Sequence, residues 1–289
     1  MDQELNEQLR AKLAPGAGLL IPGAANALAA RIIEQAGFEA LLVTGAGLAN
    51  TYLGVPDMGL TTVNELCDHV AAIREAVEIP IIADIDTGFG NALNLFRTVR
   101  MLERAGANAL QLEDQVFPKR CGHFDGKAVV SQAEMVQKIK AAVDARRGNI
   151  LILARTDARA VEGLDRALER AAAYAEAGAD LLFVEAPQSI EELAAIPRAV
   201  PGRHICNIVF GGKTPMLPQD QLAKMGYGGI LYANAALQAA MLAMQGVMRH
   251  LKATGSLAGA EAQVIGFAER QAMVDFARYQ ELEKRYTGA

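Results

Sequence analysis

Short apolar runs recur along the whole chain, separated by longer segments of mixed polarity. An apolar run of about four to eight residues that ends in polar or glycine residues is typical of a strand buried in a parallel sheet. Eight such runs predict strands at residues 19–23, 40–43, 79–83, 109–112, 150–154, 180–184, 203–206 and 229–232.

The intervening segments carry apolar residues at helical spacing. They predict helices at residues 24–36, 63–77, 92–105, 132–146, 165–177, 190–199 and 218–225. Several of these helices stop at a glycine before the next strand, as at Gly37, Gly106, Gly178 and Gly226. Strands that alternate with helices predict the α/β class and a (β/α)8 barrel of the TIM type. An open doubly wound sheet is the structural alternative.

The chain has 289 residues, of which 52% are hydrophobic and 21% charged. This composition disfavours disorder and is enough for one barrel with a large core. No segment reads as a linker between domains. We therefore expect a single barrel domain over residues 1–289, with a C-terminal helical extension at about residues 235–289.

Charge and cysteine content narrow the functional class. The net charge is −5 and no basic run is present, which argues against a nucleic-acid partner. No apolar stretch has the length of a membrane span, and the N-terminus lacks the basic and apolar regions of a signal peptide. The three cysteines do not suggest a disulfide framework. We expect a cytoplasmic enzyme without a membrane partner.

Polar side chains follow the predicted strands. Active sites of barrels of this type form at the C-terminal ends of the strands. Here those ends carry Thr44, Asp84, Asp86, Glu113, Arg155, Glu185 and Asn207. One carboxylate at a strand end is easily explained as a helix cap, but an entire series is not. The series predicts an acidic metal site with an arginine for an anionic substrate.

Asp84 and Asp86 are the most informative pair in that series. They leave the end of one predicted strand with a single residue between them, and Gly88 and Gly90 follow in the turn. Hard divalent cations such as Mg²⁺ bind clustered carboxylate oxygens and often keep several waters. A solvated acidic loop is the alternative interpretation.

Cys121 differs from the other two cysteines, which fall in a predicted helix and a predicted strand. It lies in a polar loop with Lys119, Arg120 and His123 around it. Neighbouring cations lower the pKa of a thiol and make it useful for proton transfer or nucleophilic attack. A Cys-x-His pair also suits zinc, but no second pair with ligand spacing occurs. An idle surface cysteine is the remaining alternative.

The loop Lys119-Arg120-Cys121-Gly122-His123 resembles the signature loop of the isocitrate lyase and phosphoenolpyruvate mutase superfamily. Further segments resemble motifs of that family in the family order, at residues 53–59, 83–90, 111–114, 154–158 and 184–187. The resemblance spans roughly residues 5–255. It implies a (β/α)8 barrel, a Mg²⁺ or Mn²⁺ cofactor, and a homotetramer whose C-terminal helices are exchanged between subunits.

The resemblance also implies roles for individual residues. The metal ligands would be Asp84, Asp86 and Glu113. The catalytic residues would be Cys121, Asp57, Lys119 and His123. The substrate-binding residues would be Thr44, Gly45, Ala46, Arg120, Gly122, Arg155, Glu185 and Asn207. Family members that cleave carbon–carbon bonds carry the loop cysteine, which suggests that Cys121 is a general acid on a mobile loop, residues 119–127, that closes over the substrate.

The implied reaction is Mg²⁺-dependent cleavage of a 2-hydroxy dicarboxylate to an α-keto acid such as pyruvate and a carboxylate. A 2-alkylmalate, best named as 2,3-dimethylmalate, is the expected substrate. Residues 207–215, with Lys213 after paired glycines, look more like the dimethylmalate lyase and petal-death branch, and Gln238 falls where methylisocitrate lyases carry an arginine. The alternatives are a 2-methylisocitrate lyase, an oxaloacetate hydrolase or a carboxyphosphonoenolpyruvate mutase. A non-catalytic barrel is disfavoured by the number of polar strand ends.

Overall fold

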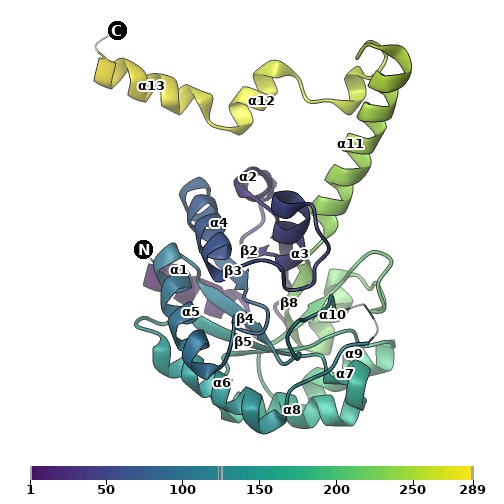
Figure 1. The fold of residues 1–289 in the computed structure, drawn as a ribbon. Coiled ribbons are helices and arrows are strands. Elements are labelled where there is room, and N and C mark those ends of the chain that lie inside the picture. Colours follow the sequence, from purple (N-terminus) through teal and green to yellow (C-terminus); the bar gives the residue numbers. More distant parts are fainter. Residues whose placement is uncertain (1, 123, 125, 288–289) are drawn as a thin grey trace. The chain divides into compact units, whose positions relative to one another are not determined.

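A computed structural model describes residues 2–122, 124 and 126–287 of the chain. Within these residues, eight parallel strands form a closed barrel in sequence order (Figure 1). The strands are β1 Leu19–Ala24, β2 Leu41–Val43, β3 Ile81–Asp84, β4 Ala109–Glu113, β5 Leu151–Thr156, β6 Leu181–Val184, β7 His204–Asn207 and β8 Tyr227–Tyr232. β8 pairs with β1 and closes the barrel. The predicted (β/α)8 fold is confirmed, and the open-sheet alternative is wrong.

The predicted helices surround this barrel, with ends that differ by a few residues from the predicted ones. They are α2 Ala27–Gln35, α4 Val63–Ala76, α5 Ala92–Ala105, α6 Gln132–Ala145, α8 Leu164–Glu176, α9 Ile190–Ala199 and α10 Gln219–Met225. α2 starts later than predicted because the Asn26 side chain caps it by accepting a hydrogen bond from the backbone N–H of Ala29. A capping box of Thr62 and Glu65 fixes the start of α4.

Several short elements were not predicted. α1 Asp2–Lys12 precedes the barrel, and its Leu9 and the adjoining Leu13 are buried among the apolar residues inside the barrel. α3 Gly45–Leu48 and the π-helix η1 Ala49–Leu53 follow β2, and α7 Ala158–Glu162 follows β5. α3 begins just after the C-terminal end of β2 and continues directly into η1, and α7 begins just after the end of β5.

Alternation along the strands separates two apolar cores. On β5, Leu151 and Leu153 belong to the cluster inside the barrel, whereas Ile152 and Ala154 belong to the cluster between sheet and helices. Side chains of a strand point alternately to its two faces. The same parity therefore decides which polar residue at a strand end points into the barrel.

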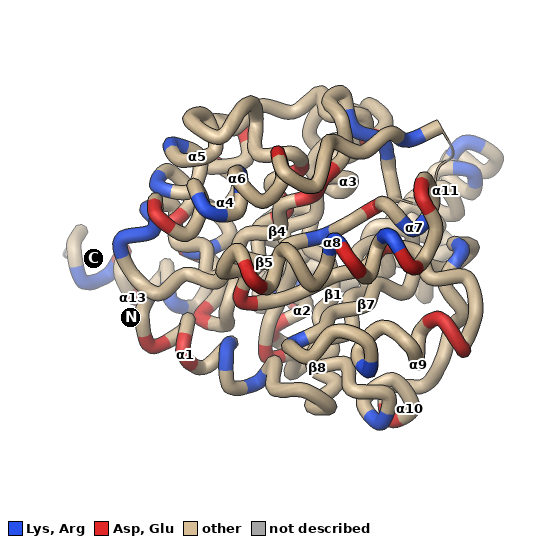
Figure 2. The backbone as a smooth tube through the Cα atoms, turned by 90° about the horizontal axis from the view of Figure 1, so that it is seen from below, with Lys and Arg blue, Asp and Glu red and all other residues tan. Residues whose placement is uncertain are grey.

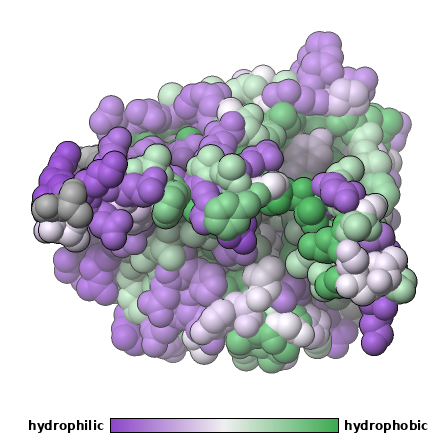
Figure 3. All heavy atoms as spheres, turned by 90° about the horizontal axis from the view of Figure 1, so that it is seen from above, coloured by the Kyte–Doolittle hydropathy of each residue, from purple (hydrophilic) through white to green (hydrophobic). Residues whose placement is uncertain are grey.

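The chain divides into two compact units, Met1–Ala235 and Ala236–Ala289. The barrel forms the first unit. The second contains most of α11 Ala235–Thr254, then η2 Glu261–Gln263, α12 Phe267–Met273 and α13 Phe276–Thr287. Many of its apolar side chains are exposed. Figure 3 shows apolar side chains among polar ones on the surface of the molecule.

Basic and acidic residues are interspersed along the backbone in the view of Figure 2. They are not gathered there into one basic surface. Among the described residues, no helix combines the length and apolar character that a membrane crossing requires.

Candidate active site

The alternation of side chains along the strands brings the predicted polar residues together at one end of the barrel. Ile82 on β3 and Ile205 on β7 belong to the cluster inside the barrel, and two residues later come Asp84 and Asn207. By the same alternation, the C-terminal end of the barrel receives Thr44, Glu113, Arg155 and Glu185. Most are largely shielded from solvent: Thr44, Glu113, Arg155, Glu185 and Asn207 are all buried.

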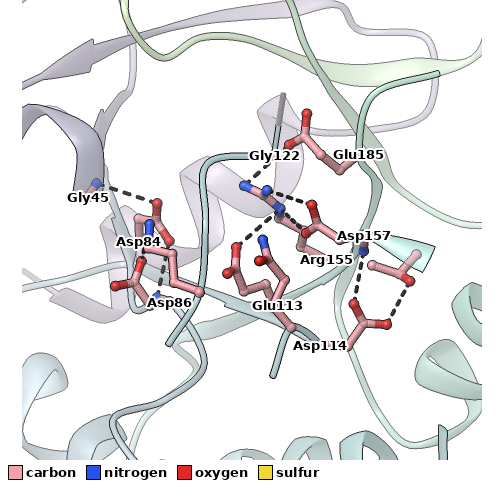
Figure 4. A network of polar contacts seen from close by, with 12 residues as sticks. Gly45, Asp84, Asp86, Glu113, Asp114, Gly122, Arg155, Asp157 and Glu185 are labelled. Carbon is pink, nitrogen blue, oxygen red and sulfur yellow. Dashed lines mark hydrogen bonds and ion pairs between the residues drawn. The ribbon is translucent and has the colours of Figure 1, made fainter. Parts of the chain in front are cut away.

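Asp84 and Asp86 form one side of the site (Figure 4). The Asp86 backbone N–H donates to Asp84 Oδ1 at 3.2 Å, and the Gly45 backbone N–H donates to Asp84 Oδ2 at 3.4 Å. Asp86 has a left-handed φ of 49°, an uncommon conformation for a residue with a side chain. Its carbonyl accepts from the Glu113 backbone N–H at 2.9 Å, which ties the turn to β4.

Lys119 lies among these carboxylates. Its Nζ is 2.8 Å from Asp86 Oδ1 and also forms a short ion pair with Asp57. Burial raises the pKa of Asp86 to about 7, and Lys119 opposes that rise without cancelling it. Burial also raises the pKa of Glu113 well above its usual value, with Arg155 opposing it. Four carboxyl groups, those of Asp86, Glu113, Asp57 and Asp84, thus act on the single lysine, and this excess of acidic groups over lysine favours uptake of a further cation.

Arg155 forms the other side of the site, between three carboxylates. Its Nε and Nη2 donate to Asp157 at 2.9 and 3.1 Å, so Asp157 accepts a two-point hydrogen bond. Its Nη1 lies 3.2 Å from Glu185 Oε2, and its Nε lies 3.4 Å from Glu113 Oε2. Burial opposes the charge, but these carboxylates raise the pKa of Arg155 well above its usual value. Arg155 is thus a fixed cation at the mouth of the barrel.

Asp157, for which no role was predicted, is held in turn by Asp114. Asp114 Oδ1 accepts from the backbone N–H of Asp157 at 2.9 Å, and its Oδ2 accepts from the hydroxyls of Thr156 and Tyr174, both at 2.7 Å. Each of these hydrogen bonds satisfies a buried polar group. Asp157 directly follows β5, and this position at a strand end is the feature of the sequence that could have identified it as a site residue.

The described residues of the loop 119–127, which we call the Cys121 loop, lie over this network. At its start, the Gln115 side chain accepts from the Arg120 backbone N–H at 2.9 Å and donates to the Arg120 carbonyl at 2.8 Å. Gly122 contacts Arg155 and Glu185 so closely that an added Cβ would lie 2.4 Å from Arg155 Nη2. The described residues of the loop are therefore seated on the arginine at the barrel mouth.

A cavity of about 40 Å³ lies between the loop and the barrel. It gathers predicted residues from both: Thr44, Ala46, Asp57, Asp84, Lys119, Arg120, Cys121, Gly122, Arg155, Glu185 and Asn207. Asp86 and Glu113 are buried close by, while Gly45 touches Asp84 from behind. His123, also predicted to be catalytic, lies outside the described residues.

Some lining residues were missed from the sequence. Gln111 on β4 and Asn234 after β8 reach the cavity, as do the apolar side chains of Leu42, Phe183 and Leu231 from inside the barrel. Asn234 follows the last strand by two residues, and the other site residues were predicted from similar positions after strands. The apolar lining carried no signal of its own, because a core residue and a cavity wall look alike in sequence.

The donor set of the acidic side suits a hard cation that keeps part of its water shell. Glu113 Oε1 is buried without a hydrogen-bond partner among the described residues, and Asp84 and Asp86 supply further carboxylate oxygens nearby. Yet nowhere in the described part of the chain do three His, Cys, Asp or Glu side chains converge as a ready-made metal site. Since Mg²⁺ is commonly held by one or two carboxylates and water, the residues fit a site with indirect contacts.

Comparisons with known proteins identify the family of the chain. A model of the phosphoenolpyruvate phosphomutase family matches residues 9–252. The chain is 45% identical over 269 residues to the 2,3-dimethylmalate lyase of Eubacterium barkeri, covering 93% of each chain. It is 46% identical over 238 residues to the 2-methylisocitrate lyase of Aeropyrum pernix, covering 82% of this chain and 77% of the relative.

Solved structures show the same architecture. A 2,3-dimethylmalate lyase superposes with a TM-score of 0.91 at 31% identity, covering 98% of this chain and 94% of the other. A phosphonopyruvate hydrolase in complex with oxalate and Mg²⁺ superposes with a TM-score of 0.87 at 32% identity, covering 98% and 99%. The chain therefore belongs to the phosphoenolpyruvate phosphomutase family, within the isocitrate lyase and phosphoenolpyruvate mutase superfamily. It is an enzyme of the carbon–carbon lyase type.

Proposed function

We propose that this enzyme cleaves a 2-alkylmalate, with 2,3-dimethylmalate the best named substrate, to pyruvate and a carboxylate. The observation that carries the proposal is the cavity in which the Cys121 thiol, the Arg155 guanidinium and the Asp84 carboxylate all line one space. A thiol can supply a proton, a guanidinium can hold a carboxylate, and a carboxylate can hold a metal. Cleavage of a hydroxy dicarboxylate needs all three.

The proposed reaction breaks the bond between C2 and C3. A base removes the proton of the C2 hydroxyl, the C2 oxygen becomes the keto oxygen of pyruvate, and the bonding electrons move to C3. Asp57 lines the cavity beside Lys119 and is our candidate for the group that accepts the hydroxyl proton. Cys121 then donates the thiol proton to C3, which completes the carboxylate product. General acid–base steps of this kind contribute roughly 10²–10⁴-fold to rates.

Two arginines would bind the two substrate carboxylates. Arg155 is held in place by Asp157, and Arg120 is held through its backbone by Gln115. Holding groups in position before substrate arrives lowers the entropy cost of reaching the reactive geometry. We assign Glu185, Asn207 and the backbone around Gly45 and Ala46 to supporting roles at the same end of the cavity.

Asp84 and Asp86, with Glu113 behind them, are the residues that would hold Mg²⁺ or Mn²⁺. When bound, such a cation stabilises negative charge that develops on the substrate oxygens. This assignment is supported by the excess of carboxylate around Lys119 and by the buried oxygen of Glu113, which has no hydrogen-bond partner in the described part of the chain.

The choice of a 2-alkylmalate over a tricarboxylate rests on the apolar residues that line the cavity and, separately, on one position in the sequence. The barrel side of the cavity is lined by Leu42, Phe183 and Leu231, which suit an alkyl substituent. Gln238 stands where our placement puts an arginine in methylisocitrate lyases, and it lies on α11 in the second unit. The relatives include a 2,3-dimethylmalate lyase and a 2-methylisocitrate lyase, so 2-methylisocitrate is the alternative substrate.

A panel of substituted malates, assayed with Mg²⁺ for release of keto acid, tests the proposal. We expect 2,3-dimethylmalate to be cleaved with a higher kcat/KM than 2-methylisocitrate, with pyruvate and a carboxylate formed in equal amounts. Oxalate and acetate from oxaloacetate, or a rearranged phosphonate from a phosphonate substrate, would replace the lyase assignment by the hydrolase or mutase alternative.

A further inference from the structure

A second lysine of the Cys121 loop is buried beside the active site, and no role was expected for it. The side chain of Lys127 is 1% exposed. Its Nζ donates to Asp157 Oδ1 at 2.9 Å and, through a short hydrogen bond, to the carbonyl of Gly122. A buried ammonium is stable only when it is paired and hydrogen-bonded, and here both partners belong to the active-site region.

The two partners of Lys127 lie on different parts of the chain. Gly122 is in the Cys121 loop, next to the proposed acid, whereas Asp157 follows β5. Asp157 is the same carboxylate that accepts the two-point hydrogen bond from Arg155. One side chain thus connects the backbone beside Cys121 to the group that orients Arg155.

The charges on Asp157 explain why this connection is strong. Burial by itself would raise the pKa of Asp157, but Arg155 and Lys127 lower it to about 2. The carboxylate is therefore ionised and shared between two cations. Its position is fixed from behind by Asp114, which accepts from the Asp157 backbone N–H at 2.9 Å. Lys127 is consequently anchored to a rigid part of the barrel.

At the other end of the connection, the Gly122 backbone is packed closely against the barrel. A Cβ at Gly122 would lie 2.7 Å from the side chain of Glu185 as well as 2.4 Å from Arg155 Nη2. The Gly122 backbone therefore seats against the barrel only in a narrow range of positions. A displacement of about 1 Å at a reacting group is enough to cost on the order of 10²-fold in rate.

We propose that Lys127 is a positioning residue for the proposed cleavage. By bridging the Gly122 carbonyl and the Asp157 carboxylate, it holds the Cys121 thiol over the cavity and couples the seating of the loop to the orientation of Arg155. The kinetic consequence rests on the lyase function proposed above. The structural consequence, seating of the loop, does not.

Hydrogen–deuterium exchange of the native enzyme with Mg²⁺ tests the seating of the loop directly. We expect Lys127→Met, which keeps the apolar length but removes the ammonium, to increase exchange at least tenfold in peptides that cover residues 119–127. Peptides from β4 and β5 should exchange as in the parent enzyme. Lys127→Arg, which keeps a cation able to reach both oxygens, should restore much of the protection.

Lys138 supplies the matched control. It is also a buried lysine close in sequence, but its Nζ donates to the carbonyl of Thr87 at 3.2 Å. Lys138→Met removes a buried ammonium of the same kind, so it separates a general loss of stability from a specific loss of the connection. We expect it to leave exchange in residues 119–127 unchanged.

Kinetics provide the second readout. With the substrate identified by the malate panel, Lys127→Met should lower kcat about 10²-fold and raise KM less than tenfold, because the carboxylate-binding cations remain. Parent-level exchange in the loop of Lys127→Met would overturn the proposal, whatever the substrate proves to be. Should that variant exchange rapidly throughout the barrel, Lys127→Gln gives the same comparison, since its shorter, uncharged side chain also removes the ammonium, and unchanged loop exchange there would equally overturn the proposal.

Discussion

The buried charges of the active site hold one another in place, residue by residue. Arg155 is surrounded by Asp157, Glu185 and Glu113, and Lys119 by Asp57 and Asp86. A buried charge without such partners would be strongly destabilising. The cavity can therefore present fixed cations and anions to a substrate without first reorganising, which is the condition for electrostatic catalysis.

At this scale, Cys121 is the residue with the most specific prediction. Cys121→Ser keeps the size of the side chain but provides a far weaker acid, so cleavage should slow by about 10²–10⁴-fold. Substrate binding should change much less because Arg155 and the metal ligands remain. Single-turnover kinetics and substrate titration measure the two effects separately. Parent-level cleavage by Cys121→Ser would remove the thiol as the acid and favour the hydrolase or mutase alternative.

Asp84 carries the prediction for the metal. Asp84→Ala should abolish keto-acid release and Mg²⁺ binding while the circular dichroism spectrum stays that of the parent, because the side chain lies at a strand end rather than in the core. Calorimetric titration with Mg²⁺ measures the binding. Asp144→Ala, at an exposed carboxylate on α6, is the control and should bind as the parent does. Full activity in excess chelator would contradict the metal assignment.

At the scale of elements, the site depends on the segment that comes directly after each strand. Short strands end at the barrel mouth, and α3, η1 and α7 begin soon after β2 and β5. A long segment leads from the end of β4 to the start of α6. Its base is closed by an antiparallel bridge between Gln115 and Val129 and by the Val130 backbone N–H, which donates to the Asp114 carbonyl at 2.8 Å. The Cys121 loop is thus presented by a small paired stem.

Gly122 provides the test at this scale. Gly122→Ala places a methyl group against Arg155 and Glu185, so the Cys121 loop cannot seat as it does in the parent. We expect kcat to fall about 10²-fold and the melting temperature to change only slightly, since the loop lies outside the core. Gly266→Ala is the control, because an added Cβ there meets no described atom within 4 Å. Equal activities of the two variants would contradict close seating of the loop.

At the scale of the whole molecule, the second unit exposes a row of large apolar side chains. Met241, Met244, Met248 and Leu251 on α11 recur at helical spacing and are all exposed. Contiguous apolar surface of this kind commonly marks a protein interface. This arrangement supports our proposal, first drawn from the family resemblance, that the chain assembles as a homotetramer through its C-terminal helices.

Analytical ultracentrifugation tests that proposal. We expect the parent chain to sediment as a tetramer at micromolar concentration. Met244→Glu combined with Met248→Glu should shift it towards smaller species, because charges would be buried in an apolar contact. Arg249→Gln, on the same helix, is the control and should leave the tetramer intact. A monomeric parent chain would show that the exposed residues serve another purpose.

The residues at the strand ends show how much of the site could be predicted from the sequence. The positions of Asp84, Glu113, Arg155 and Asn207 could be predicted because each follows an apolar run, and the alternation of side chains then directs each into the barrel. Lys127 could not be predicted in the same way. It lies in an irregular loop, where spacing carries no periodic signal, and its partner Asp157 is distant in sequence.

The amino-acid sequence by itself determined the barrel, the order of its strands and helices, and the identity of most polar groups at its mouth. Those features follow from local patterns, namely apolar periodicity, glycine stops and polar residues after strands. The tertiary structure alone decided which charges are paired. Lys119 lies between Asp57 and Asp86, and Asp157 is shared by Arg155 and Lys127. Such pairings depend on distances between separate loops, which no local pattern in the sequence encodes.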